Sequence, residues 1–309
     1  MEAKNTGFKI EHVFEEYKEQ IKLMENQYGQ EEDLYPWIYM LLMESGIINN
    51  LSMRQVANAP WANSVLGREM LRGYASWPDI AIVDKEFYAI NISEKIDSKK
   101  KYIANWIAKG LKIQEDCDFV NDILVNNMKN DDELKEFLRN YWYLHNIDKI
   151  RGCVEVKKIG DTLVDIKTGE HELIINYKQD GWYAKLDSEQ SYNLIKKNKL
   201  LNPGQLFGEL FWYGKVLYTN GLKWKYLEVI ECCNNTIKNI ANLRKILYKD
   251  CVYSQEPTKL WCEQISKLQK IKNGLRIKIK CESYPSENCV DDGKEDIGLK
   301  DWIKKNVCF

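Results

Sequence analysis

Histidine and proline are scarce in this chain, and the cysteines lack the spacing of a metal site. The 309 residues include three histidines, six prolines and nine cysteines, and no Cys-x-x-Cys pair occurs. So few histidines and no paired cysteines argue against a structural zinc site. An odd number of cysteines without a disulfide framework is typical of free thiols, so we expect a reducing, cytoplasmic compartment.

Long hydrophobic runs are also missing. The N-terminus is polar and charged, and nowhere does the chain contain about 18 consecutive apolar residues, the length that a membrane-spanning helix needs. We therefore expect neither secretion nor a membrane partner. A Walker-type phosphate loop is absent as well, which argues against a nucleotide-driven motor.

Neither sign of charge dominates. The chain carries 45 Lys and Arg against 46 Asp and Glu, a formal net charge of −1. A nucleic-acid partner would therefore have to meet a local basic patch rather than a globally basic protein. The runs at 99–101 and 196–199 are the candidates. With 44% apolar residues, one large domain or two modest ones is expected.

Hydrophobic periodicity predicts helices and strands in a mixed order. Residues 8–45 read as helices that end at Gly46, and Asn202-Pro203 reads as a helix start with Asn202 as the N-cap. Residues 93–150 and 234–272 also have helical spacing. The expected strands are 80–83, 87–92, 154–159, 163–167, 172–177, 182–186, 216–218, 224–230 and 276–281.

Two of these strands carry polar residues in an apolar setting. Asp79 follows Trp77-Pro78 and begins the apolar run that continues through Ile82. Glu155 and Lys157 alternate with valines in another run. Side chains two residues apart in a strand point to the same face, so Glu155 and Lys157 should project together. An acid–acid–lysine cluster of this kind suits a hard divalent cation beside a phosphate.

A third motif follows the same strands. Gln205 lies in a helical run and is followed by a strand that ends in Thr219-Asn220-Gly221, with Trp224 shortly after. The ordered set is an N-terminal helix, an Asp-bearing strand, a Glu-x-Lys strand, a Gln-bearing helix and a strand ending in Thr-Asn-Gly. This set resembles the PD-(D/E)xK nuclease superfamily, and most of all the nuclease domain of type I restriction motor subunits.

The resemblance implies a fold and a division of the chain. The implied fold is a restriction-endonuclease-like α/β core, with a central mixed sheet flanked by helices and interrupted by a helical insertion. Residues 1–92 and 151–230 would form the nuclease core, 93–150 the insertion, and 231–309 a helical C-terminal region packed on the core or following it.

The resemblance also implies a metal site. Asp79, Glu155 and the backbone carbonyl of Val156 would bind Mg²⁺ or Mn²⁺, since hard cations prefer oxygen ligands. Lys157 would orient or deprotonate the attacking water and offset charge on the phosphate. Gln205 would position water or a phosphate oxygen from its helix.

A further helix acid often joins such a site, and Glu32 is the best candidate. Glu44 and Glu69 are weaker ones.

The implied activity is metal-dependent hydrolysis of DNA, in prokaryotic or phage defence or in DNA processing. DNA is favoured over RNA.

Several alternatives remain open at the level of sequence. Asp165-Ile166-Lys167 has the same acid-x-Lys spacing and rivals the motif at Glu155, although Thr168-Gly169 places it near a hairpin end. An RNA endonuclease, or a non-catalytic nucleic-acid-binding protein that keeps the fold, would fit the same motifs. A homodimer, an activating partner or a small-molecule activator is also open.

Overall fold

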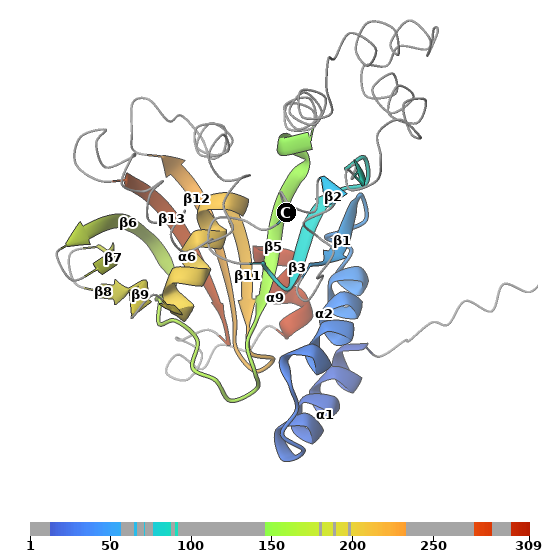
Figure 1. The fold of residues 1–309 in the computed structure, drawn as a ribbon. Helices are drawn as coiled ribbons and strands as arrows, with labels where there is room; N and C mark the ends of the chain where they lie inside the picture. Colours follow the sequence, from blue (N-terminus) through green and yellow to red (C-terminus); the bar gives the residue numbers. More distant parts are fainter. Residues whose placement is uncertain are drawn as a thin grey trace, which may run out of the picture.

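The structure is a computed structural model. It describes residues 13–56, 65–66, 71, 77–87, 90–91, 146–178, 181–187, 190–196, 199–232, 275–285 and 298–309. Most of the expected insertion, the expected helix at 234–272, the basic run at 99–101 and Glu69 lie outside these residues. Within the described part, the chain folds into one large mixed sheet flanked by helices (Figure 1).

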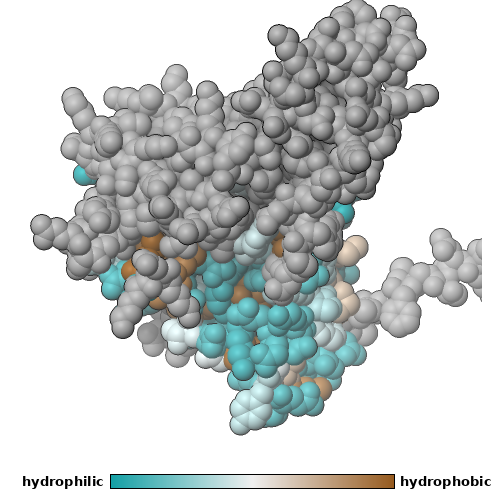
Figure 2. Space-filling model, viewed as in Figure 1, coloured by the Kyte–Doolittle hydropathy of each residue, from teal (hydrophilic) through white to brown (hydrophobic). Residues whose placement is uncertain are grey.

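Two helices precede the sheet. They are α1 (Val13–Asn26) and α2 (Glu31–Ser45). Gly46 ends α2 at φ +77, a left-handed conformation that glycine adopts without steric penalty, as its position after the helical run predicted. Both helices bury one side against the sheet, and Figure 2 shows that their outer surface is mostly hydrophilic.

The sheet contains nine strands in the order β1-β3-β5-β11-β12-β13-β6-β7-β8. Among the strands of the described residues, only the β5–β11 pair is parallel. Their bounds are β1 (Leu51–Gln55), β3 (Ile80–Asp84), β5 (Ile150–Val156), β6 (Gly169–Lys178), β7 (Gly181–Leu186), β8 (Gln190–Asn193), β11 (Lys215–Thr219), β12 (Trp224–Cys232) and β13 (Leu275–Tyr284). A 3-10 turn, η5 (Ile147–Lys149), leads into β5.

The remaining elements are short, apart from two helices. Two small ribbons pair β2 (Val65–Leu66) with β4 (Ile90–Asn91) and β9 (Ile195–Lys196) with β10 (Lys199–Leu200). Helix α6 (Asn202–Tyr213) joins β10 to β11, and α9 (Leu299–Asn306) follows β13. When the intervening strands β2, β4 and β6 to β10 are set aside, α2, β1, β3, β5, α6 and β11 follow one another as an α-β-β-β-α-β series.

The helices cover opposite faces of the sheet. Val154 and Val156 pack into a core with residues of α1, α2 and α9, including Leu34, Ile38 and Trp302. Successive strand residues point to opposite faces of the sheet. Glu155, between these two valines, therefore points to the opposite face, where α6 lies. Figure 1 shows α6 in front of the sheet and α9 behind it.

The sequence pattern missed β1 and β8 of the large sheet and the short strands β2, β9 and β10, and it predicted one strand that is not there. Residues 51–55 form β1 beside β3, although Leu-Ser-Met-Arg-Gln has weak strand composition. The expected strand at 163–167 is wrong, because residues 161–167 are irregular. Side chains satisfy this backbone instead of a neighbouring strand: the Tyr192 hydroxyl donates to the carbonyl of Asp165, and Lys225 Nζ donates to that of Ile166 at 2.5 Å.

Helix α6 begins one residue earlier than expected. Leu201, not Asn202, is the N-cap, and Asn202 is already helical. Pro203 still lies in the first turn, where its missing N–H is not needed for helical hydrogen bonds. The late strand expected at 276–281 exists as part of β13 and lies between β12 and β6 inside the sheet. No described helix is long and apolar enough to span a membrane.

Candidate active site

Glu155 and Lys157 share one face at the end of β5. Lys157 Nζ donates a hydrogen bond to Glu155 Oε1, and both side chains are nearly inaccessible to solvent. The pairing of β5 with β11 extends one residue beyond the end of β5: Lys157 N donates a hydrogen bond to Thr219 O on β11 at 2.7 Å. The Glu-x-Lys spacing therefore places an ion pair on the face of the sheet that α6 covers.

Asp79 lies beside this pair at the start of β3. Its Oδ2 accepts a hydrogen bond from Val156 N at 2.6 Å, and its Oδ1 accepts one from the Tyr35 hydroxyl at 2.5 Å. In an extended strand, the N–H and C=O of one residue point to the same edge. The carbonyl of Val156 is therefore directed to the side on which Asp79 lies.

Helix α6 contributes two side chains that are four residues apart and therefore share a helix face. Gln205 Oε1 accepts a hydrogen bond from Lys157 Nζ at 3.3 Å. One turn on, the fully buried carboxyl group of Glu209 is a hydrogen-bond partner of Glu155. Two carboxyl groups can share a hydrogen bond only when one of them is protonated.

Burial governs the titration of the site. It raises the pKa of Glu155 to about 8, with help from the charge of Asp79, while Lys157 acts in the opposite direction. Burial and the neighbouring Glu155 raise the pKa of Glu209 well above its usual range. The pKa of Asp79 is also raised by burial, although hydrogen bonds from Tyr35 and Val156 oppose the rise.

Lys157 stays charged despite its burial. Burial acts to lower its pKa, but its contact with Glu155 and the nearby charge of Glu31 outweigh that effect, so its pKa is raised. A lysine with a raised pKa is poorly suited to accept a proton at neutral pH. This electrostatic setting favours orientation of water and charge compensation over general-base chemistry for Lys157.

Helix α2 brings a second pair of polar residues, Glu31 and Tyr35, also four residues apart. Glu31 is half-buried; burial raises its pKa, and the charge of Lys157 and a hydrogen bond from the Lys158 backbone oppose the rise. Glu32 is exposed, although its charge contributes to the raised pKa of Asp79. Glu44 lies at the other end of α2, where its carboxylate pairs with Lys300 at 2.9 Å.

The Thr219-Asn220-Gly221 turn has a structural role that is visible in its contacts. Asn220 Oδ1 accepts a hydrogen bond from Lys223 N at 2.8 Å, and Thr219 Oγ1 accepts one from Gly221 N at 2.9 Å. The Tyr17 hydroxyl donates to Gly221 O at 2.6 Å. The turn therefore holds the end of β11, to which Lys157 is bonded, against the N-terminal helices.

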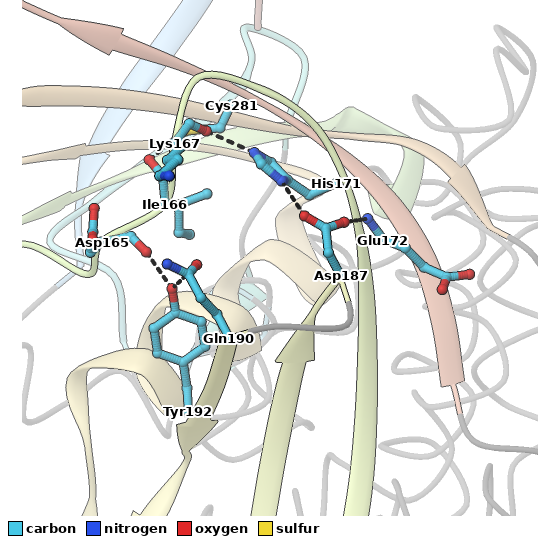
Figure 3. A network of polar contacts seen from close by, with 9 residues as sticks. All are labelled: Asp165, Ile166, Lys167, His171, Glu172, Asp187, Gln190, Tyr192 and Cys281. Atoms are coloured by element: carbon cyan, nitrogen blue, oxygen red, sulfur yellow. Dashed lines mark hydrogen bonds and ion pairs between the residues drawn. The ribbon is translucent and has the colours of Figure 1, made fainter. Parts of the chain in front are cut away.

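The rival motif has a different environment, shown in Figure 3. The side chains of Asp165 and Lys167 are exposed, and only Ile166 between them is buried. The backbone carbonyl of Lys167 contacts His171 Nε2 at 2.8 Å, and His171 Nδ1 pairs with Asp187 at 2.8 Å. These contacts anchor the loop before β6 and bring no second acid to Asp165 and Lys167.

Three residues that sequence reasoning missed lie in the site: Glu31, Tyr35 and Glu209. Glu209 had a detectable signal, since it is the only charged residue in the apolar run from Leu206 to Tyr213. Tyr35 and Glu31 had none, because nothing local indicates which face of α2 meets the start of β3.

The oxygen donors of the site fit a hard cation better than a soft one. Glu155 Oε2 is buried, and no N–H or hydroxyl group of the described residues donates a hydrogen bond to it, so this oxygen is available to a cation or to the neighbouring protonated Glu209. In the arrangement seen, no group of three or more His, Cys, Asp or Glu residues in the described part of the chain is placed to hold a metal ion.

Comparisons with protein-family models, with curated proteins and with solved structures give no match to this chain. The resemblance drawn from the motifs therefore stays a prediction.

Proposed function

We propose that this protein is a metal-dependent nuclease that hydrolyses phosphodiester bonds in DNA. The observation that carries the proposal is the convergence of the buried Asp79, Glu155 and Lys157, at the start of β3 and the end of β5, with the partly buried Gln205 of α6. The α-β-β-β-α-β series that remains when β2, β4 and β6 to β10 are set aside, with β5 and β11 parallel, also supports the proposal.

The roles of the side chains follow from their positions. Asp79, Glu155 and the carbonyl of Val156 would hold Mg²⁺ or Mn²⁺, which supplies positive charge at the scissile phosphate and acidifies a bound water. Lys157, charged and tied to Glu155, offsets negative charge that develops on the phosphate. Gln205 restricts Lys157 and can orient water, and Glu209 holds the Glu155 carboxyl group.

A non-catalytic nucleic-acid-binding protein is the second candidate. The contact between Lys157 Nζ and Glu155, together with the lack of three converging metal-ligating side chains among the described residues, favours it. Catalysis would require Glu155 to exchange part of its contact with Lys157 for a cation. Binding of nucleic acid without metal-dependent cleavage would select this second candidate.

Cleavage assays test the proposal. Supercoiled plasmid, linear duplex DNA, single-stranded DNA and RNA are incubated with Mg²⁺ or Mn²⁺ and with wild type, Asp79→Asn or Lys157→Gln. We expect metal-dependent cleavage of DNA that falls roughly a hundredfold or more in each variant, since both remove charge that acts on the transition state. RNA cleavage in place of DNA cleavage would identify an RNA endonuclease.

The rival motif supplies a matched control. Asp165→Asn and Lys167→Gln make the same chemical changes at exposed positions, so activity should stay near that of wild type. Activity that survives Asp79→Asn and Lys157→Gln but is lost in the two control variants would move the site to the loop before β6. Activity that survives all four changes would contradict the proposal.

A further inference from the structure

A cavity of about 380 Å³ lies outside the candidate active site, between α1, the Gly221 turn, the end of β13 and the start of α9. This volume is within the range typical of small-molecule sites and too small for a folded partner. Its lining comes from four segments that are far apart in the sequence, so the cavity exists only in the folded protein.

Aromatic rings form much of its lining. Phe14 and Tyr17 come from α1, Trp224 from β12 and Tyr284 from β13. The ring of Tyr17 is tilted by 59° against that of Trp224, with centroids 6.1 Å apart, and its hydroxyl is already bonded to Gly221 O. Tyr17 and Trp224 are almost wholly buried and back the cavity, whereas the partly exposed rings of Phe14 and Tyr284 offer apolar faces and edges against which a flat aromatic molecule can pack.

The charged residues of the lining are mostly basic. Lysines outnumber acids there by three to one: Lys18, Lys22 and Lys300 against Glu15. Lys18 and Lys22 are exposed and four residues apart, so they lie along one face of α1. Lys300 Nζ lies 5.4 Å from the centroid of the Phe14 ring and also forms an ion pair with Glu44. A positive charge therefore lies next to an aromatic ring of the lining.

We propose that this cavity binds a small, planar aromatic molecule that carries an anionic group. The ring packs among the aromatic side chains, and the anionic group lies near Lys18 and Lys22 at the opening. The chemistry is shared by nucleotides and by aromatic acids. The proposal does not depend on nuclease activity, since none of the lining residues belongs to the candidate active site.

Fluorescence titration with the aromatic sulfonate 8-anilinonaphthalene-1-sulfonate tests the proposal on the full chain. We expect saturable binding of one probe per chain, weakened roughly two- to twentyfold in Lys18→Gln/Lys22→Gln, as expected for two partly exposed charge contacts. Binding of the uncharged analogue N-phenyl-1-naphthylamine should be unchanged by the same substitutions. Lys196→Gln, at an exposed position on β9, is the matched control and should bind both probes like wild type.

A second variant tests the aromatic wall. Phe14→Leu keeps an apolar side chain but removes the ring, and should weaken binding of both probes. Displacement of the sulfonate by adenosine monophosphate would identify a nucleotide as occupant, and displacement by 1-naphthoate alone an aromatic acid. Unsaturable probe binding, binding insensitive to the lysine and Phe14 substitutions in variants with wild-type circular dichroism, or displacement by neither competitor would overturn the proposal.

Discussion

Glu209 is a carboxylic acid that the fold holds where a negative charge is unfavourable. It is fully buried against Glu155, and its pKa is raised well above the ordinary value of 4.5. Because the pKa is higher in the folded state, the native protein binds more protons at this group than the unfolded chain does. Protonated Glu209 therefore contributes its full stabilisation below about pH 4.5, and that stabilisation is lost as pH rises through the pKa of the folded state.

We therefore expect the free energy of unfolding of wild type, without added metal, to fall between about pH 5 and pH 8. In Glu209→Gln the fall should be smaller by roughly 1–3 kcal/mol, because glutamine has the shape of the protonated acid but does not titrate. Urea denaturation at both pH values measures the difference. Glu170→Gln, at an exposed position, should keep the wild-type pH dependence; equal pH dependence in wild type and Glu209→Gln would contradict the account.

Tyr35 stabilises the ionised form of Asp79 through its hydroxyl group. Tyr35→Phe removes that hydrogen bond, so the pKa of Asp79 should rise further and the acidic limb of the cleavage profile should move to higher pH. The free energy of unfolding should fall by roughly 1.5–3 kcal/mol at neutral pH, as for other buried hydrogen bonds to charged groups. Rates measured from about pH 5 to pH 9 and urea denaturation test both effects.

Tyr39→Phe is the matched control, because Tyr39 lies one turn further along α2 and its side chain is a hydrogen-bond partner of the Gln55 backbone on β1. It should leave the pH profile of cleavage unchanged. A Tyr35→Phe profile that coincides with that of wild type would show that the hydroxyl group does not affect the titration of Asp79.

At the scale of elements, turns place the strands that carry the site. Gly221 has φ +85, and a Cβ added there would lie 3.1 Å from side-chain atoms of Ile21 and Leu34. Gly160 has a similar φ of +89, but a Cβ there would meet nothing within 4 Å. A comparison of substitutions at the two glycines therefore separates the cost of backbone strain from the cost of crowding against the N-terminal helices.

We expect Gly160→Ala to lower the free energy of unfolding by about 1–2 kcal/mol through backbone strain alone. Gly221→Ala should lower it by roughly a further 1–3 kcal/mol, because the tightly packed side chains of Ile21 and Leu34 would have to move. Urea denaturation of both variants gives the comparison. Equal losses would mean that the turn is not tightly packed against α1 and α2.

The elements also show how local reasoning failed. The run at 163–167 has a strand's composition, but side chains from β8 and β12 take the hydrogen bonds of its carbonyl groups. Residues 51–55 have a loop's composition, yet they pair with β3 in register from Leu51 to Gln55. In both cases a partner distant in sequence decided the structure, and no local propensity reveals such a partner.

At the scale of the whole molecule, the C-terminal segment completes the core on the face of the sheet that α1 and α2 cover. Trp302 and Ile303 of α9 are buried with residues of α2, and Phe309 fills the space above Gly152 on β5. The last helix and the N-terminal helices therefore belong to one packed unit.

Trp302→Ala should lower the free energy of unfolding by about 3–5 kcal/mol, as expected for loss of a large core side chain. Lys304→Ala, at an exposed position on the same helix, should change it by less than about 0.5 kcal/mol. Unfolding followed by circular dichroism and by fluorescence should remain a single transition in wild type. A small effect of Trp302→Ala would indicate that α9 is not part of the cooperative core.

Local sequence patterns predicted the alternation that places Glu155 and Lys157 on one face, the helix end at Gly46, and the positions of β3, β11 and β12. These features depend on the local period of side chains and on turn residues, which neighbouring positions reveal. The same patterns do not predict that Glu31, Tyr35 and Glu209 join Asp79 and Glu155, or that β13 enters the sheet beside β12. These arrangements are contacts between distant segments, which depend on packing and strand register and are therefore visible only in the folded chain.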